Sequence, residues 1–170
     1  TETQQPKVSI IVPVFNRETL VQRLISTVQQ QTFQDWELLL IDDASTDGTL
    51  EVIKSAMLND DRFVLQNNTH KKGTSGARNT GLDIASGKYI AYQDSDDEWF
   101  EHHLEKMVHY LDKSEGKIDL MSADPLRKYE ETGEVFNDDK MTMETIPHKC
   151  EGELFLINPD CLFEKQLMGR

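Results

Sequence analysis

Three carboxylates crowd into the four residues Asp94-Ser95-Asp96-Asp97, here called the acidic tetrapeptide. Carboxylates a few ångströms apart repel one another unless a proton or a bound cation offsets their charge. Their hard oxygen atoms suit Mg²⁺ or Mn²⁺. A second interpretation is an acidic turn at the start of the next helix, because negative side chains are favoured at the positive end of the helix dipole.

The surrounding sequence alternates between apolar runs of strand length and amphipathic segments. The runs are 8–14, 36–41, 63–65, 88–92 and 118–123. Apolar or small residues at helical spacing follow each of the first four runs: Leu20, Leu24 and Val28; Leu50, Ile53 and Met57; Gly76, Ala77, Thr80, Gly81, Ile84 and Ala85; and Leu104, Met107, Val108 and Leu111. Asn16 is expected to cap the first helix. Four strand–helix units in succession predict an α/β/α sandwich with a largely parallel central sheet.

Polar residues follow these strands at their carboxyl ends, where ligands bind in open parallel sheets. Strand one continues into 15–17, strand two into 42–45, strand three into 67–73 and strand four into the acidic tetrapeptide. Two acidic clusters and a basic, glycine-containing loop therefore share one edge of the sheet. A structural turn does not require this coincidence, so the sequence favours the cation-binding interpretation.

The pattern changes after residue 123. A hairpin turning at Gly133 is predicted within 124–136, a loop over 137–151, and a terminal helix over about 160–168. With 170 residues, of which 37% are hydrophobic, the chain has enough apolar side chains for one core. We therefore expect a single domain over 1–170, with the motif-bearing core at 7–123.

Charge and motif spacing exclude several function classes. The net charge of -13 argues against non-specific nucleic-acid binding, and no apolar stretch approaches the roughly 18–20 residues of a membrane span. A calcium loop starting at Asp43 would need Glu where Lys54 stands. Neither the P-loop nor the dinucleotide fingerprint is present. A nucleotidyltransferase would carry a glycine-rich basic run after strand one, which is also missing.

Five motifs occur in a fixed order along the chain: Val8 to Asn16, Gln31-Thr32-Phe33, Glu37 to Thr49, Gly76 to Gly81, and Tyr92 to Asp97. Together they resemble the family 2 glycosyltransferases of the GT-A fold, over about residues 7–123. This resemblance implies transfer of a sugar from a nucleotide diphosphate donor to an acceptor hydroxyl, with inversion at the anomeric carbon.

The resemblance also implies roles for single residues. Asp43 would accept a hydrogen bond from uracil N3–H, which favours a UDP-sugar, and Pro13 and Phe15 would line the base pocket. Arg78 would lie near the diphosphate, where its guanidinium offsets charge. Residue types alone leave alternatives open: Asp42 and Asp43 as caps of a helix starting near Ser45, Phe15 as a core residue, and Arg78 as an ordinary surface arginine.

Asp94-Ser95-Asp96 matches the DXD motif of the family. By resemblance Asp96 is the ligand of a divalent metal, Mn²⁺ or Mg²⁺. Asp94 and Ser95 belong to the donor-binding residues, with Asp94 on the ribose or sugar side, and Asp97 is a weaker candidate.

The catalytic base of the family is an Asp or Glu well beyond the DXD motif, and no residue of this sequence matches it. We expect the chain to be the donor-binding part of a longer enzyme of cell-envelope or polysaccharide assembly. The alternative is a shortened homologue that binds a nucleotide sugar without turnover. The expected location is cytoplasmic, with membrane association of a full-length protein left open. The acceptor, a glycan or a lipid-linked sugar, is not specified.

Overall fold

The computed structural model describes residues 5–114, 120–123, 126–128, 135–137, 148–151 and 154–157. The chain divides into two compact units, residues 1–105 and 106–170. Each unit is described by itself. The expectation of one domain over 1–170 stays a prediction.

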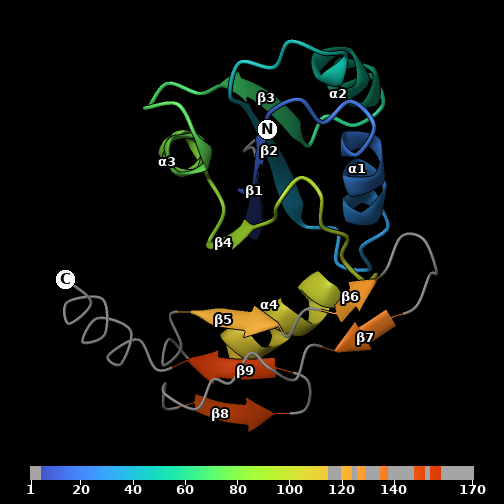
Figure 1. Ribbon diagram of the computed structural model, residues 1–170. Coiled ribbons are helices and arrows are strands. Elements are labelled where there is room, and N and C mark those ends of the chain that lie inside the picture. The colour runs from blue at the N-terminus through green and yellow to red at the C-terminus, as the bar shows by residue number, and fades with distance from the viewer. Residues whose placement is uncertain are drawn as a thin grey trace, which may run out of the picture. The chain divides into compact units, whose positions relative to one another are not determined.

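The first unit is built on a four-stranded sheet with the order β3-β2-β1-β4 (Figure 1). Its strands are β1 (Val8–Val14), β2 (Trp36–Asp42), β3 (Phe63–Asn67) and β4 (Tyr89–Tyr92), and all three pairings are parallel. Val14 lies opposite Asp42, and Asp42 lies opposite Asn67, so β1, β2 and β3 end level with one another. The predicted α/β architecture with a parallel central sheet is confirmed.

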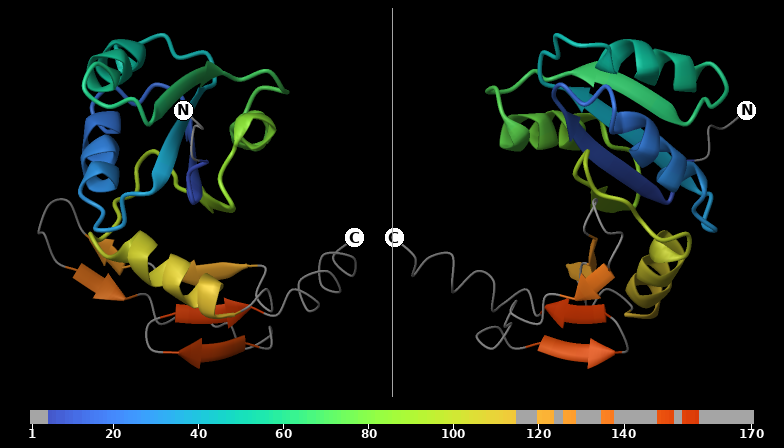
Figure 2. Two further views of the ribbon diagram at one scale, coloured as in Figure 1. Left: turned by 180° about the vertical axis from the view of Figure 1, so that it is seen from behind. Right: turned by 45° about the vertical axis from the view of Figure 1, so that its right-hand side comes forward.

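Helices cover both faces of this sheet. The helices α1 (Val21–Gln29) and α2 (Thr49–Met57) lie on one side, and α3 (Thr74–Ile84) lies on the other (Figures 1 and 2). This two-sided cover explains why β1 and β2 are nearly continuous apolar runs with almost every residue buried. On the α3 side, Ile11, Leu39 and Ile41 form a cluster with Ala77.

The small-residue face of α3 packs against the central strands, as the sequence predicts. Gly76, Ala77, Thr80 and Gly81 are buried, whereas Ile84 is 39% exposed and lies outside this face. A Cβ atom on Gly81 would overlap Cγ2 of Ile11. The missing side chain of Gly81 therefore sets how closely α3 approaches β1.

Asn16 does not cap the first helix, so that prediction is wrong. Helix α1 starts at Val21 without a side-chain cap, and Asn16 adopts a left-handed backbone conformation with φ of 52°. Its side-chain Oδ1 accepts a hydrogen bond from the backbone N–H of Thr46 at 2.8 Å. Its own N–H donates to Ser45 Oγ at 3.0 Å. Asn16 therefore joins the loop after β1 to the loop after β2.

Gln31 fixes the segment that follows the acidic tetrapeptide. Its side chain is 1% exposed; Nε2 donates to the Phe100 carbonyl at 2.8 Å, and Oε1 accepts from the backbone N–H of Leu104 at 3.0 Å. Leu104 lies in the first turn of α4 (His103–Lys113). Gln31, two residues after the end of α1, thus holds the start of α4.

The second unit contains short antiparallel strands. β5 (Met121–Ala123), β9 (Leu154–Ile157) and β8 (His148–Glu151) form one sheet in that order, and β6 (Leu126–Lys128) pairs with β7 (Val135–Asn137). The pairing of β6 with β7 confirms the predicted hairpin, although its turn at Gly133 lies outside the described residues.

The sequence predicts a loop over 137–151 and a terminal helix over about 160–168 in this unit. The loop predicted over 137–151 is wrong for 148–151, because β8 pairs there through its backbone with β9 although its side chains are mostly polar. The sequence analysis also missed β9. The helix predicted over about 160–168 lies outside the described residues.

Gly81→Ala is expected to lower the free energy of unfolding by up to about 2 kcal/mol. Overpacking a core costs about 1–3 kcal/mol and outweighs the gain of about 1 kcal/mol from replacing glycine by alanine within a helix. The measurement is urea unfolding. In an Ile11→Ala background the same substitution should be neutral or stabilising, because the overlapping methyl group is gone. An equal loss in both backgrounds would contradict this explanation.

Candidate functional site

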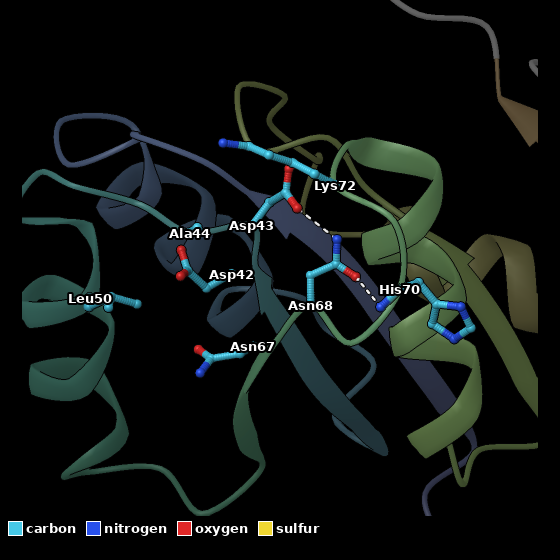
Figure 3. Close-up of a pocket in the computed structure, with 8 residues that line it drawn as sticks. All are labelled: Asp42, Asp43, Ala44, Leu50, Asn67, Asn68, His70 and Lys72. Atoms are coloured by element: carbon cyan, nitrogen blue, oxygen red, sulfur yellow. Dashed lines mark hydrogen bonds between the residues drawn. The ribbon is translucent and has the colours of Figure 1, made fainter.

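The candidate site lies at the carboxyl ends of the parallel strands. A hollow of about 440 Å³ opens at the ends of β2 and β3 (Figure 3). It is lined by Asp42, Asp43, Ala44, Leu50, Asn67, Asn68, His70 and Lys72. The sheet order places the end of β1 between this hollow and the end of β4, from which the acidic tetrapeptide follows.

Asp43 is a buried carboxylate of the hollow that the neighbouring loop holds through both oxygens. It is 8% exposed, and both of its oxygens accept hydrogen bonds from the loop 68–73. Oδ1 accepts from Asn68 Nδ2 at 2.6 Å and Oδ2 accepts from the backbone N–H of Gly73 at 2.8 Å. Figure 3 shows Asp43 and Asn68 pointing toward each other.

Neither Asp42 nor Asp43 caps α2, because this helix starts at Thr49 with Gly48 at the N-cap position. Asp42 instead closes a tight turn: its carboxylate oxygens accept from the backbone N–H of Ser45 at 3.1 and 3.3 Å. The helix-cap alternative for these two residues is therefore wrong.

Pro13 and Phe15, the two residues predicted to line the base pocket, lie at the end of β1. Phe15 is 42% exposed, so the alternative of a core residue is wrong, and the Lys72 ammonium lies 4.7 Å from its ring centroid. Pro13 is half-buried within β1 opposite Ile41. Neither residue lines the hollow itself, but the Lys72 side chain links Phe15 to it.

The acidic tetrapeptide is held by two arginines, one from α3 and one from the loop after β1. Arg78, on α3, donates from Nη2 to Asp94 Oδ1 at 2.8 Å. Arg17, after β1, donates from Nε to Ser95 Oγ at 3.1 Å, and its Nη2 lies 4.0 Å from Asp96 Oδ2. Arg78 therefore has a specific ionic partner. Arg17 was missed by the sequence analysis, because its partners are 78 and 79 residues away along the chain.

The acidic tetrapeptide does not start a helix, since α4 begins only at His103. The helix-turn alternative for the cluster is thus wrong. Burial raises the pKa of the Asp97 carboxyl, and the neighbouring charges of Asp94 and Asp96 raise it further. The repulsion expected from the sequence is therefore present, and the two arginines offset part of it.

A divalent metal fits these residues only with help from a ligand. Within the described ranges, no three His, Cys, Asp or Glu side chains lie close enough together to hold a metal. The carboxylates of Asp94 and Asp96 are about half exposed, at 53% and 56%. Mg²⁺ typically binds one or two carboxylates together with substrate phosphates and water. The donor set therefore suits a cation whose coordination is completed by a diphosphate.

The family model described as Glycosyl transferase family 2 matches residues 9–151. The chain belongs to this family. It is 44% identical over 107 residues to UDP-Glc:alpha-D-GlcNAc-diphosphoundecaprenol beta-1,3-glucosyltransferase WfgD of Escherichia coli, covering 63% of this chain and 42% of that protein. It is 43% identical over 104 residues to GalNAc(5)-diNAcBac-PP-undecaprenol beta-1,3-glucosyltransferase of Campylobacter jejuni, covering 61% of this chain and 34% of that protein. The chain thus spans well under half the length of these relatives.

Solved structures confirm the GT-A fold of this family 2 chain. S. aureus TarS 1–349 in complex with UDP superimposes with a TM-score of 0.66 at 22% identity, covering 94% of this chain and 49% of that one. A mannosyltransferase from Pyrobaculum calidifontis, in complex with GDP-Man and Mn²⁺, gives a TM-score of 0.65 at 22% identity, covering 96% of this chain and 47% of that one.

In the described part of the chain, no helix combines the length and apolar character needed to cross a membrane.

Asp97→Asn is expected to stabilise the metal-free protein at neutral pH. The pKa of Asp97 in the folded state lies above the ordinary 3.8. The contribution of this carboxyl to the free energy of unfolding is therefore fully present below pH 3.8, where the carboxyl is protonated. It is lost as the pH rises through the folded-state pKa, because the carboxyl then becomes charged. Asparagine carries no charge to bury, so the gain should appear above pH 3.8 and then level off. Urea unfolding in EDTA between about pH 3 and pH 7 measures this difference. A gain of equal size throughout that range would rule out a charge effect.

Proposed function

We propose that this chain holds the nucleotide-sugar donor, a UDP-sugar, of a metal-assisted inverting glycosyltransferase. The observation that carries the proposal is the placement of two unlike sites on either side of the end of β1. On one side lies a hollow with the carboxylate acceptor Asp43, and on the other lies an acidic tetrapeptide paired with arginines. This matches a donor with a nucleobase at one end and a diphosphate at the other.

The hollow is assigned to the nucleobase. Its volume of about 440 Å³ falls within the common range of small-ligand sites. The Asp43 carboxylate would accept from the N3–H of uracil, and Pro13 and Phe15 would border the base from the end of β1. The Escherichia coli relative, 44% identical to this chain, is named for UDP-Glc, which supports UDP over other nucleotides.

The acidic tetrapeptide is assigned to the metal and the diphosphate. A chain with a net charge of -13 repels a polyanionic donor unless cationic groups act locally. Arg78 and Arg17 supply such charge, and the Asp96 carboxylate would hold Mn²⁺ or Mg²⁺. Asp94 and Ser95 would bind the donor, with Asp94 on the ribose or sugar side. When bound, the cation stabilises the negative charge that grows on the departing nucleotide diphosphate.

The acceptor side of the reaction belongs to the proposal as well. Inverting transfer requires a base that removes the proton of the acceptor hydroxyl, and no residue of this chain matches it. The names of the two relatives specify undecaprenol-linked sugars, which favours a lipid-linked acceptor at the cytoplasmic side of a membrane. Without such a base, the chain would bind the donor without turnover, which is the second candidate function.

A thermal-shift panel tests the donor assignment. UDP with Mn²⁺ is expected to raise the melting temperature more than GDP, CMP or dTDP, because a ligand that binds only the folded state stabilises it. The Asp96→Asn variant should lose the dependence on Mn²⁺. Glu98→Gln, which removes the same charge two residues away and leaves the tetrapeptide intact, should keep it. Unchanged metal dependence in Asp96→Asn would refute the ligand role. UDP release from UDP-sugars, measured for the chain, separates transfer from binding alone.

Arg17→Met is expected to raise the affinity for Mn²⁺ in the absence of nucleotide by up to about five-fold. A cation 4.0 Å from Asp96 competes with the metal ion, and removing it relieves a repulsion of this order in a water-like medium. Its UDP affinity should fall, because a positive charge near the diphosphate is lost. Arg23→Met, whose guanidinium lies 3.2 Å from Glu98, controls for net charge. Equal Mn²⁺ affinities in both variants would contradict a local effect of Arg17.

A further inference from the structure

A chain of directed hydrogen bonds runs from the loop 68–73 through Thr80 on α3 and back through Asn68 to Asp43. It starts at the backbone N–H of Thr69, which donates to Thr80 Oγ1 at 3.0 Å. A backbone N–H donates only, so the Thr80 hydroxyl accepts there and keeps its single hydrogen for another partner. That hydrogen reaches Asn68 Oδ1 at 2.9 Å, and the Thr69 hydroxyl, 3.2 Å from Thr80 Oγ1, can donate to the second lone pair of Thr80. Thr80 is 1% exposed, so water does not compete for these bonds.

These donors fix the orientation of the Asn68 amide. Its Oδ1 accepts from the Thr80 hydroxyl and from the backbone N–H of His70, each at 2.9 Å. Its Nδ2 donates to the Lys71 carbonyl at 3.2 Å and to Asp43 Oδ1 at 2.6 Å. A flipped amide would place its NH₂ group against the His70 N–H and its oxygen against two acceptors. The surroundings therefore permit one orientation (Figure 3).

Asp43 stands at the end of this chain as an acceptor. The Asn68 amide donates to one of its oxygens and the Gly73 N–H donates to the other. These two bonds fix the orientation of the Asp43 carboxylate. Its remaining lone pairs can accept a hydrogen bond from a ligand in the hollow.

We propose that Thr80 and Asn68 set the nucleobase preference of the hollow, because their directed hydrogen bonds hold Asp43 as an acceptor. The inference rests on the proposed function and deepens it. Uracil presents a donor, N3–H, at the ring position where cytosine presents an unprotonated acceptor nitrogen. Thr80 and Asn68 are positioning residues in this account: Thr80 acts on the base through Asn68, and Asn68 acts through Asp43.

The expected preference is about 10- to 100-fold for UDP over CDP. A hydrogen bond to a charged group, such as that from uracil N3–H to the Asp43 carboxylate, typically changes a binding constant by this factor. In CDP the ring nitrogen is itself an acceptor, so this bond is lost. Weaker binding of every nucleotide would result from loss of the loop structure alone. The ratio of the two dissociation constants therefore reports the directed hydrogen bonds, separately from loop stability.

Isothermal titration of UDP and CDP with Mn²⁺ tests the proposal on the full chain. Thr80→Val keeps the shape of the side chain but removes the hydroxyl, and the UDP/CDP preference should fall several-fold. Thr80→Ser retains the hydroxyl and should keep the preference. Asn68→Asp places a second carboxylate against Asp43, and such a pair captures a proton that one of them then donates. Its preference should fall to near one.

The outcomes separate this inference from the proposed function. Absence of UDP binding to the unaltered chain would overturn the proposed function itself. A UDP preference in the unaltered chain that persists in both Thr80→Val and Asn68→Asp would overturn only the role of Thr80 and Asn68. An equal loss of UDP and CDP affinity would mean that Thr80 and Asn68 only stabilise the loop, and it would also overturn the inference. If the Thr80→Val variant does not fold, the ratio of UDP to CDP affinity in Asn68→Asp alone tests the inference.

Discussion

Parallel pairing of the four strands is the constraint on which the first unit depends. It sends every strand's carboxyl end to the same edge, so the polar groups after β1, β2, β3 and β4 meet there whether or not they are compatible. Asp43 and the acidic tetrapeptide bring several negative charges to this edge. The sheet order keeps them apart, because β1 lies between β2 and β4. The residues after β1 consequently face both groups: Asn16 contacts the loop after β2, and Arg17 contacts the loop after β4.

The ionic contacts at this edge differ in strength from the hydrogen bonds beside them. The side chains of the Arg17–Asp96 and Arg78–Asp94 pairs are between 38% and 56% exposed, and ion pairs of this kind contribute about 0–1 kcal/mol. They therefore yield to a cation or a diphosphate at little cost. Asp43 is buried and doubly hydrogen-bonded, so it does not move as readily. The edge thus combines one rigid carboxylate with two half-exposed charge pairs.

Sequence patterns predicted the parts of the structure that repeat a local rule. The strands β1 and β2 are buried on both faces and read as continuous apolar runs, and the small residues of α3 follow a helical period. Asn16 broke the local rule, because its side chain serves a neighbouring loop and not the helix after it. The strand β9 is a run of four apolar residues that the sequence analysis overlooked. The strand β8 is mostly polar and is identified only by its pairing with β9.

The candidate site divides in the same way. The positions Asp43, Arg78 and Asp94 to Asp96 could be chosen as candidates from the resemblance to the motifs of the family. Arg17, Asn68 and Thr80 could not, because their roles arise from contacts with residues distant in sequence. The direction of a hydrogen bond depends on which partner is a fixed donor, and only the folded backbone decides that.

The anchoring of the acidic tetrapeptide at both ends bears on the entropy of binding. Before it, the Gln93 N–H donates to the Ile11 carbonyl at 3.2 Å, and after it, Gln31 holds Phe100 and Leu104. A short loop pinned at both ends has few backbone conformations to lose when a ligand arrives. Side-chain ordering is then the main conformational cost, and it is smaller than the cost of ordering a free loop. The buried amide of Gln31 thereby preorganises the carboxylates.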